Sequence, residues 1–167
     1  LIICFELHLY TGKIGFVLDN KPSYLIDLAT CLIGNMIGIV AVCGLALLTK
    51  TGSALTTAAT TLVESKYNDS WYSLLILSIL CGMIIYLAVI AHKKIENNFG
   101  KVIAVFALIA LFIICGFEHV IANAAYFMYA KVFDWKTVLW FVIMVAGNSI
   151  GSILIDLLFK GIKKFSE

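Results

Sequence analysis

Two ionisable pairs stand inside stretches that are otherwise apolar. Glu118 and His119 interrupt residues 102–130, and Glu6 and His8 interrupt residues 1–18. A carboxylate or an imidazole is costly to bury in hydrocarbon, so such residues usually mark a functional site. A neutral histidine presents one N–H donor, and it titrates near physiological pH. The pattern indicates polar chemistry held within apolar surroundings.

The composition defines those surroundings. The chain has 167 residues, of which 62% are hydrophobic and 13% charged, and its mean hydropathy is +1.04. A soluble domain carries about a quarter charged residues. So few polar residues cannot cover this much apolar surface in water. The chain is therefore an integral membrane protein, which excludes an ordinary cytosolic enzyme and a nucleic-acid-binding module.

Three stretches are long enough to cross a bilayer, which takes about 20 apolar residues in a helix. They are residues 24–48, 71–91 and 137–159. Residues 102–130 and 1–18 are interrupted by polar residues and glycine. Unpaired backbone is tolerated at membrane depth only inside protein or along a watery cavity. We therefore expect an all-α membrane protein in which two broken helices line the functional site.

Lysines orient these elements, because cytoplasmic connections carry the larger number of them. One set holds Lys21, Lys93, Lys94, Lys101, Lys160, Lys163 and Lys164, and the other holds Lys50, Lys66, Lys131 and Lys136. Seven against four predicts that the first set and the C-terminus are cytoplasmic. Trp71, Tyr72, Trp135 and Trp140 then fall at the outer boundary, where interfacial aromatic residues are enriched.

The chain also contains an internal repeat. Residues 4–8 (CFELH) echo residues 115–119 (CGFEH), and residues 34–38 (GNMIG) echo residues 147–151 (GNSIG). Glu6 precedes Gly34 by 28 residues and Glu118 precedes Gly147 by 29. By analogy with the second unit, we expect the first unit to have another span upstream of Leu1, and the chain to be a fragment. Three spans per unit require the two units to be inverted, as in many transporters.

These motifs resemble a known family. Residues 116–123 (GFEHVIAN) resemble the G-F-E-H-x-x-A-N signature of the formate/nitrite transporter family. Residues 9–12 (LYTG) resemble the loop that breaks the family's second helix, although formate channels carry Phe where this chain has Tyr10. The two G-N-x-x-G helices and Lys66 also fit. Within the family, the sequence is most similar to the hydrosulfide channels.

The resemblance implies a six-helix, aquaporin-like inverted repeat with two broken helices. Its first helix and part of the second are absent from this chain. Residues 1–167 would form one transmembrane channel domain: 1–48 end the first repeat, 49–70 are an outer loop, 71–159 are the second repeat and 160–167 are a cytoplasmic tail. The implied protein is a homopentamer in the bilayer of the cell (inner or plasma) membrane. It would pass hydrosulfide, formate or nitrite, with no enzymatic activity, cofactor, metal or nucleic-acid partner.

The resemblance also assigns polar roles. Lys66 would attract anions to the outer mouth, and His119 with Thr11 would form the central site. Asn123 and Asn148 would either supply hydrogen-bond donors to the pore or buttress the break. A dehydrated anion needs replacement hydrogen bonds, yet it must not be bound too tightly for release.

Apolar rings would narrow the pore on both sides of the histidine and reject hydrated ions. The matching positions are Leu9, Tyr10, Phe112 and Ile85. A carboxylate exposed in an anion pore would repel the permeant. We therefore expect Glu6 and Glu118 to have structural roles, bonded to backbone groups that the helix breaks set free.

Three other classes of protein remain open. The chain could be a proton-coupled formate or nitrite transporter, since the fold permits both mechanisms. It could be a haem- or metal-binding membrane protein that uses His8, His92 and His119, although no two of these share a helix face at metal-ligand spacing. It could also be a membrane scaffold, which predicts no flux and no effect of His119→Asn.

Overall fold

The computed structural model describes residues 2–166, which form helices and the turns between them. Within these residues, three helices are long and apolar enough to span a bilayer: α2 (Tyr24–Leu47), α4 (Trp71–Lys94) and α7 (Trp135–Ser166). They confirm the three uninterrupted spans that the hydropathy predicted. Helix α7 continues past residue 159, so the segment expected to be a tail is the end of this helix.

The interruption near Glu118 divides residues 98–130 into two shorter helices, α5 (Asn98–Ile114) and α6 (Val120–Ala130). Gly116 lies between them with φ 65°, a left-handed conformation that glycine adopts without a steric penalty. The chain then runs extended to His119, whose side chain accepts a hydrogen bond from Ala122 N and so caps α6. The predicted broken helix is confirmed.

The first interruption has the same construction. Glu6 takes a left-handed φ of 53°, and Leu9 is the extended residue before the short helix α1 (Tyr10–Lys13). A 3-10 segment, η1 (Ile14–Asp19), continues from α1 to the turn before α2. The first half-helix is thus only about three turns long, and its second part is wound more tightly than an α-helix.

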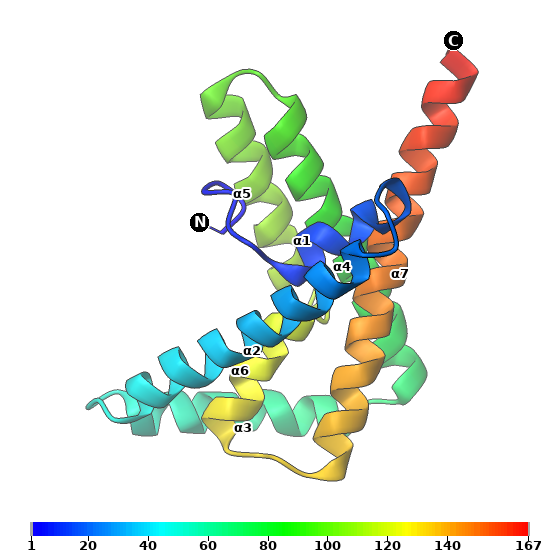
Figure 1. Cartoon of the computed structure of the whole chain (residues 1–167). Coiled ribbons are helices and arrows are strands. Elements are labelled where there is room, and N and C mark those ends of the chain that lie inside the picture. The colour runs from blue at the N-terminus through cyan, green and yellow to red at the C-terminus, as the bar shows by residue number, and fades with distance from the viewer. Residues whose placement is uncertain (1, 167) are drawn as a thin grey trace.

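Residues 49–70 do not form the loop that the sequence analysis expected. They contain a 16-residue helix, α3 (Gly52–Tyr67). Three of its threonine hydroxyl groups donate hydrogen bonds to backbone carbonyls in the preceding turn. Thr57, Thr60 and Thr61 each donate to the carbonyl four residues earlier. Figure 1 shows α3 lying across the end of the molecule where α7 begins. This helix, rather than a flexible loop, carries Lys66.

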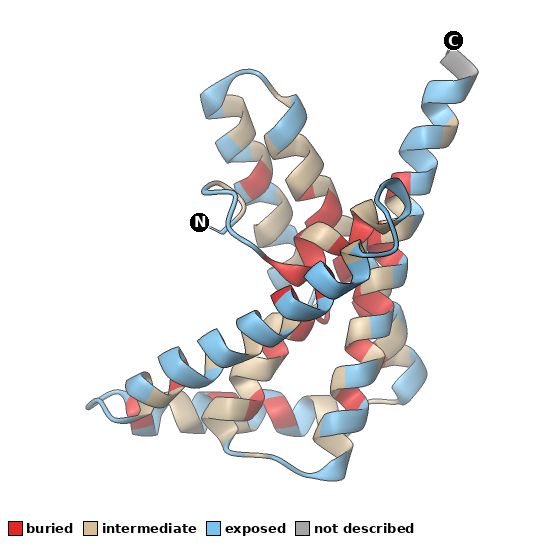
Figure 2. Ribbon diagram, in the orientation of Figure 1, coloured by how far each residue is buried: buried red, intermediate tan, exposed pale blue. Residues whose placement is uncertain are grey.

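Helices α4 and α7 pack against each other along much of their length, and glycine makes that closeness possible. A Cβ at Gly147 would meet Ser78, and one at Gly151 would overlap the carbonyl oxygen of Ile79. Helix α5 packs on α4, while α6 packs on both α2 and α3. Buried residues gather where these elements meet, and the outward face of α2 is exposed (Figure 2).

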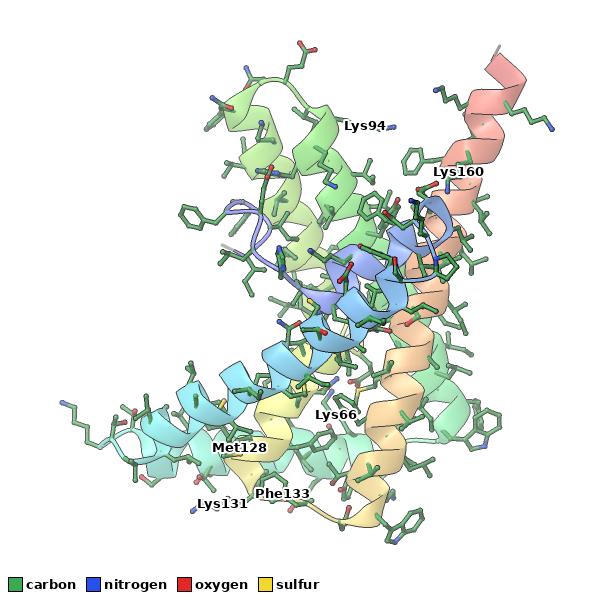
Figure 3. All side chains as sticks on the ribbon, viewed as in Figure 1. Lys66, Lys94, Met128, Lys131, Phe133 and Lys160 are labelled. Atoms are coloured by element: carbon green, nitrogen blue, oxygen red, sulfur yellow. The ribbon has the colours of Figure 1, made fainter. Side chains whose placement is uncertain are left out.

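Exposed lysines of the two sets lie toward opposite ends of the molecule. In Figure 3, Lys94 and Lys160 lie toward the end of the molecule where the C-terminus is found, and Lys131 lies at the opposite end, near α3. Trp71, Tyr72 and Trp135 are exposed near that second end, as expected of interfacial residues. Trp140 is not interfacial: it is buried, and its indole N–H donates to the carbonyl of Lys66 at 3.1 Å.

Asp134 anchors the start of α7 to α3. Its carboxylate accepts from Thr137 N at 2.8 Å and from the Tyr67 hydroxyl at 2.7 Å. The backbone hydrogen bond from Thr137, helped by the one from Tyr67, lowers the pKa of Asp134 below its ordinary value. At this end of the molecule, the start of α7 is thus capped and bonded to α3.

Candidate functional site

The two breaks meet at a direct hydrogen bond. Thr11, in the first turn after one break, places its hydroxyl 2.9 Å from Nε2 of His119, which ends the other break. Thr11 is fully buried and His119 is 7% exposed. Residues 108 positions apart are therefore joined in the interior, which is the juxtaposition that the sequence analysis expected of Thr11 and His119.

The hydrogen bonds of the imidazole fix its tautomer. Nδ1 accepts from the backbone N–H of Ala122 at 3.2 Å, so this nitrogen carries no proton. The single proton of the neutral ring is then on Nε2 and is donated to Thr11 Oγ1. A second proton would break the cap, and it would also face the positive end of α6. The geometry favours a neutral His119 with one polarised N–H.

Asn148 holds the second break in place. Its Oδ1 accepts from Val120 N at 3.0 Å, and its Nδ2 donates to Glu118 O and Ser78 O at 2.8 Å each. Backbone groups that the break leaves without helical partners are thereby satisfied. Both amide hydrogens are occupied, so Asn148 buttresses the break and has no donor left for a permeant.

Asn35 does the same for the first break, on α2. Its Oδ1 accepts from Tyr10 N at 3.0 Å and its Nδ2 donates to His8 O at 2.9 Å. Two asparagines, one from each G-N-x-I-G helix, thus hold the two half-helices with the same pair of hydrogen bonds. This confirms the internal repeat at the level of individual atoms.

The register of that repeat differs from the one read in the sequence. The matched Cys-Phe-Glu-His letters aligned Glu6 with Glu118. The asparagine hydrogen bonds instead align His8 with Glu118, and Tyr10 with Val120. Leu9 is then the counterpart of His119. The structural alignment of the two breaks therefore differs by two residues from the alignment of the sequence letters. The difference arises because each half-helix is positioned by the hydrogen bonds between its backbone and the asparagine.

The prediction that Glu6 bonds freed backbone groups is therefore wrong. Glu6 is exposed, and its side chain makes no hydrogen bond or ion pair to the described residues. Its contribution is the left-handed turn that begins the break. The backbone groups freed there are satisfied by Asn35, as shown above.

Glu118 has a structural partner, but not the one expected. Its carboxylate receives both hydrogen bonds from Lys66 Nζ, each 2.7 Å long, and a third from Asn123 Nδ2 at 2.6 Å. Lys66 is correspondingly not a solvated cation at an open mouth. It extends inward from α3 (Figure 3), and its side chain is 14% exposed. The positive charge of Lys66 cancels the negative charge of Glu118, so the ion pair beside His119 is neutral overall.

Asn123 is buried by this pair and by α7. Besides Glu118, its Nδ2 donates to the sulfur of Met144 at 3.0 Å. Its Oδ1 is buried and has no hydrogen-bond partner among the described residues. Asn123 therefore offers an acceptor, not a donor, beyond its structural contacts.

Four apolar positions were expected to narrow the site. Leu9, Tyr10 and Ile85 are buried, and the Phe112 ring lies 5.9 Å from the His119 ring, centroid to centroid. Tyr10 also bonds Ser149 through its hydroxyl at 2.9 Å, which fixes it against α7. Phe112 thus contacts the histidine directly, while Tyr10 belongs to the packing that holds the first half-helix.

A cavity of about 420 Å³ opens at the lysine-rich end and reaches the first break. Leu9 and Gly12 form part of its wall, and Thr11 lies between these two positions in the chain. His119 and Lys66 do not line it. In the described conformation, one turn of α1 therefore separates this cavity from the hydrogen bond between Thr11 and His119.

The sequence analysis named Asn148 and Lys160 but missed Ser152 and Asp156, which complete a row of polar residues along α7. Asn148, Ser152, Asp156 and Lys160 recur every fourth residue, the spacing of one helix face. The Ser152 hydroxyl lies within hydrogen-bond distance of the carbonyls of Asn148, Gly82 and Thr11. Asp156 accepts a hydrogen bond from the Tyr86 hydroxyl at 2.7 Å. Lys160 joins Asp156 to Asp19 at the end of η1. The four-residue period was the signal that could have revealed these residues.

The chain is similar to known proteins in sequence and in fold. The family model described as formate/nitrite transporter matches residues 1–160. No curated protein matches the chain. A solved structure described as a pentameric formate channel with formate bound superposes with a TM-score of 0.75, covering 98% of this chain and 76% of that one.

Only 19% of the residues are identical in that superposition, so it establishes the shared fold. The all-helical architecture with two broken helices is therefore that of a formate channel. The match to the family model extends over nearly the whole sequence. The chain belongs to the formate/nitrite transporter family, and it is a membrane protein that transports small anions rather than an enzyme.

Proposed function

We propose that this protein is a membrane channel for small monovalent anions or their conjugate acids. Hydrosulfide is the favoured permeant, and formate and nitrite are further candidates. The channel works as a homopentamer with one pore in each protomer, as the pentameric assembly of the structural neighbour supports. The C-terminus is cytoplasmic, because seven of the lysines lie at that end.

The observation that carries this proposal is the hydrogen bond between Thr11 and His119. A monovalent anion that leaves water loses several kcal/mol of hydration, even after the protein relaxes. The Nε2–H of a neutral His119 and the hydroxyl of Thr11 can replace part of that hydration when they turn from each other to the permeant. Because the ring stays neutral, the anion is not trapped by a full positive charge.

Charge balance beside the histidine supports the same function. A bare Glu118 carboxylate next to this site would repel an anion. Lys66 neutralises it through two hydrogen bonds of 2.7 Å, and Asn123 binds the same carboxylate. Lys66 therefore favours anions at the central site by cancelling the acid, in addition to any attraction at longer range.

Hydrosulfide is favoured because the motifs are most similar to the hydrosulfide branch, and because Tyr10 stands where formate channels carry Phe. Formate is supported by the fold shared with a formate-bound channel. The Oδ1 of Asn123 is buried and has no hydrogen-bond partner among the described residues. It can accept a hydrogen bond from the protonated form of a permeant, the conjugate acid. Flux measurements decide among these permeants.

The test is flux into proteoliposomes that contain the full chain. Hydrosulfide, formate, nitrite and chloride are compared across pH 5 to 8. We expect the first three to pass faster than chloride, and hydrosulfide to pass fastest. His119→Phe and Lys66→Glu should lower the flux of all three, measured on the fraction of each variant that size-exclusion chromatography isolates as the intact oligomer. Unchanged uptake in both variants would remove these residues from the mechanism.

The second candidate is a proton-coupled transporter. His119 N–H and the Thr11 hydroxyl form a chain of two exchangeable protons, which could exchange a proton with a permeant. In that case formate uptake should carry protons into the vesicle with a fixed ratio of protons to formate. A channel predicts uptake that follows the electrochemical gradient of the anion without such a ratio.

A further inference from the structure

The inner side of the first break contains a cation that the proposed function has not yet used. Lys13 is the last residue of α1, two positions after Thr11 and four after Leu9. Together with His8 and Tyr24, it lines two cavities, one of about 420 Å³ and one of about 510 Å³. Lys13 therefore lies at the boundary between the aqueous space and the wall that separates it from the central site.

The repeat shows why this position matters. The asparagine hydrogen bonds align His8 with Glu118, which also aligns Lys13 with Asn123. On the outer half, these two positions form a cluster with Lys66 whose charges cancel. On the inner half, the same two positions are both basic. The inverted half-helices thus present different electrostatics to the two ends of the site.

The charge of Lys13 is not cancelled in the same way. Glu6 lines the 420 Å³ cavity and Asp27 lines the 510 Å³ cavity, but neither forms an ion pair with Lys13 in the described structure. Lys93, which also lines the 420 Å³ cavity, lies over the Phe16 ring at 4.1 Å from its centroid. Tyr24 fixes the backbone of Lys13 by donating its hydroxyl to the Lys13 carbonyl at 3.1 Å.

We propose that Lys13 is an anion-recruiting residue on the inner side of the constriction. It holds a small monovalent anion in the 420 Å³ cavity beside Leu9, from which the anion enters the central site. His8, which shares both cavities with Lys13, adds a hydrogen-bond donor there. This inference rests on the proposed anion channel and adds the group that recruits the anion from the lysine-rich end.

The experiment measures formate and nitrite uptake against anion concentration, with the full chain in proteoliposomes. Lys13→Gln should raise the half-saturating concentration about three- to tenfold at low ionic strength, because one partly screened charge is lost. The maximal rate should stay within about twofold. Lys13→Arg should behave as wild type, and Lys94→Gln is the matched control, because Lys94 is exposed at the same end and lines neither cavity.

A second measurement keeps the test independent of folding differences between variants. In a background without the five native cysteines, Lys13→Cys is assembled once and then modified with a methanethiosulfonate that bears either an ammonium or a sulfonate group. The ammonium should restore the low half-saturating concentration and the sulfonate should raise it further. Equal kinetics after both reagents, or unchanged kinetics in Lys13→Gln, would overturn the role of Lys13. Absence of anion flux in the wild type would instead contradict the proposed function itself.

Discussion

Glu118 is tolerated at the break because neighbouring side chains neutralise its carboxylate and donate hydrogen bonds to it. Lys66 and Asn123 supply three hydrogen bonds to its carboxylate. The desolvation of two ions is offset only when the geometry is good and the remaining lone pairs are satisfied. This cluster meets that condition, and it ties α3 to the second break.

Removal of one partner should therefore cost more than removal of both. Lys66→Met leaves a buried carboxylate without its counter-ion, which should destabilise the protein by about 3–5 kcal/mol. The double variant Lys66→Met with Glu118→Gln should recover much of that loss. Thermal unfolding of the detergent-solubilised protein measures both. Equal stability of the single and double variants would show that the pair is not coupled.

Thr11 should matter for both flux and stability, because it accepts the only hydrogen bond from His119 Nε2 in the described structure. Thr11→Val keeps the shape and removes the hydroxyl. We expect a destabilisation of about 1 kcal/mol, typical of one hydrogen bond, and a flux reduced roughly fivefold or more. Thr11→Ser keeps the hydroxyl and serves as the control. Wild-type flux in Thr11→Val would separate Thr11 from permeation.

At the scale of elements, the contact between α4 and α7 positions the site. Asn148 reaches Ser78 O and the second break only because the two helices approach closely at Gly82, Gly147 and Gly151. Small residues permit such contact in membranes, where apolar side chains gain little from leaving lipid. Ser152 and Asp156 then continue this contact toward the lysine-rich end.

Gly151→Ala should loosen this helix pair. The new Cβ would overlap the carbonyl oxygen of Ile79, which is backbone and cannot rotate away. We expect a loss of about 1–3 kcal/mol in stability, together with reduced flux, because Asn148 would shift with the helix. Gly161→Ala is the matched control on the same helix: its Cβ meets nothing within 4 Å, so stability should be unchanged or higher. Thermal unfolding compares the two variants.

At the scale of the whole molecule, the surface is apolar around its middle and basic at one end. Many large apolar side chains of α2, α5 and α7 are exposed, among them Ile26, Ile37, Phe106 and Val142. Such a surface is compatible with lipid and with neighbouring protomers. The lysines at the two ends then decide which end faces the cytoplasm.

Labelling of single cysteines in intact cells tests this orientation. In a cysteine-free background, Lys131→Cys should react with a membrane-impermeant maleimide, because Lys131 is exposed at the end that we assign to the outside. Lys94→Cys, exposed at the other end, should react only after permeabilisation. The opposite pattern would invert the proposed topology and would move the Lys13 cavity to the outer side.

The sequence by itself determined the class, the spans and the family. Composition and hydropathy depend only on residue type, so α2, α4, α7 and both breaks could be predicted from runs of apolar residues. The GFEHVIAN motif at residues 116–123 likewise located His119. The role that we propose for Thr11 rests on the repeat and the family resemblance, because both are patterns along the chain.

Only the tertiary structure decided which groups meet. Lys66 pairs with Glu118 across 52 residues, and Asn35 and Asn148 hold the half-helices in a register that the letters of the sequence did not give. The helical form of residues 52–67 and the burial of Trp140 were likewise not predicted. A carboxylate or amide can bond any donor that the fold brings near, so its partner is set by distances in space and not by spacing along the chain.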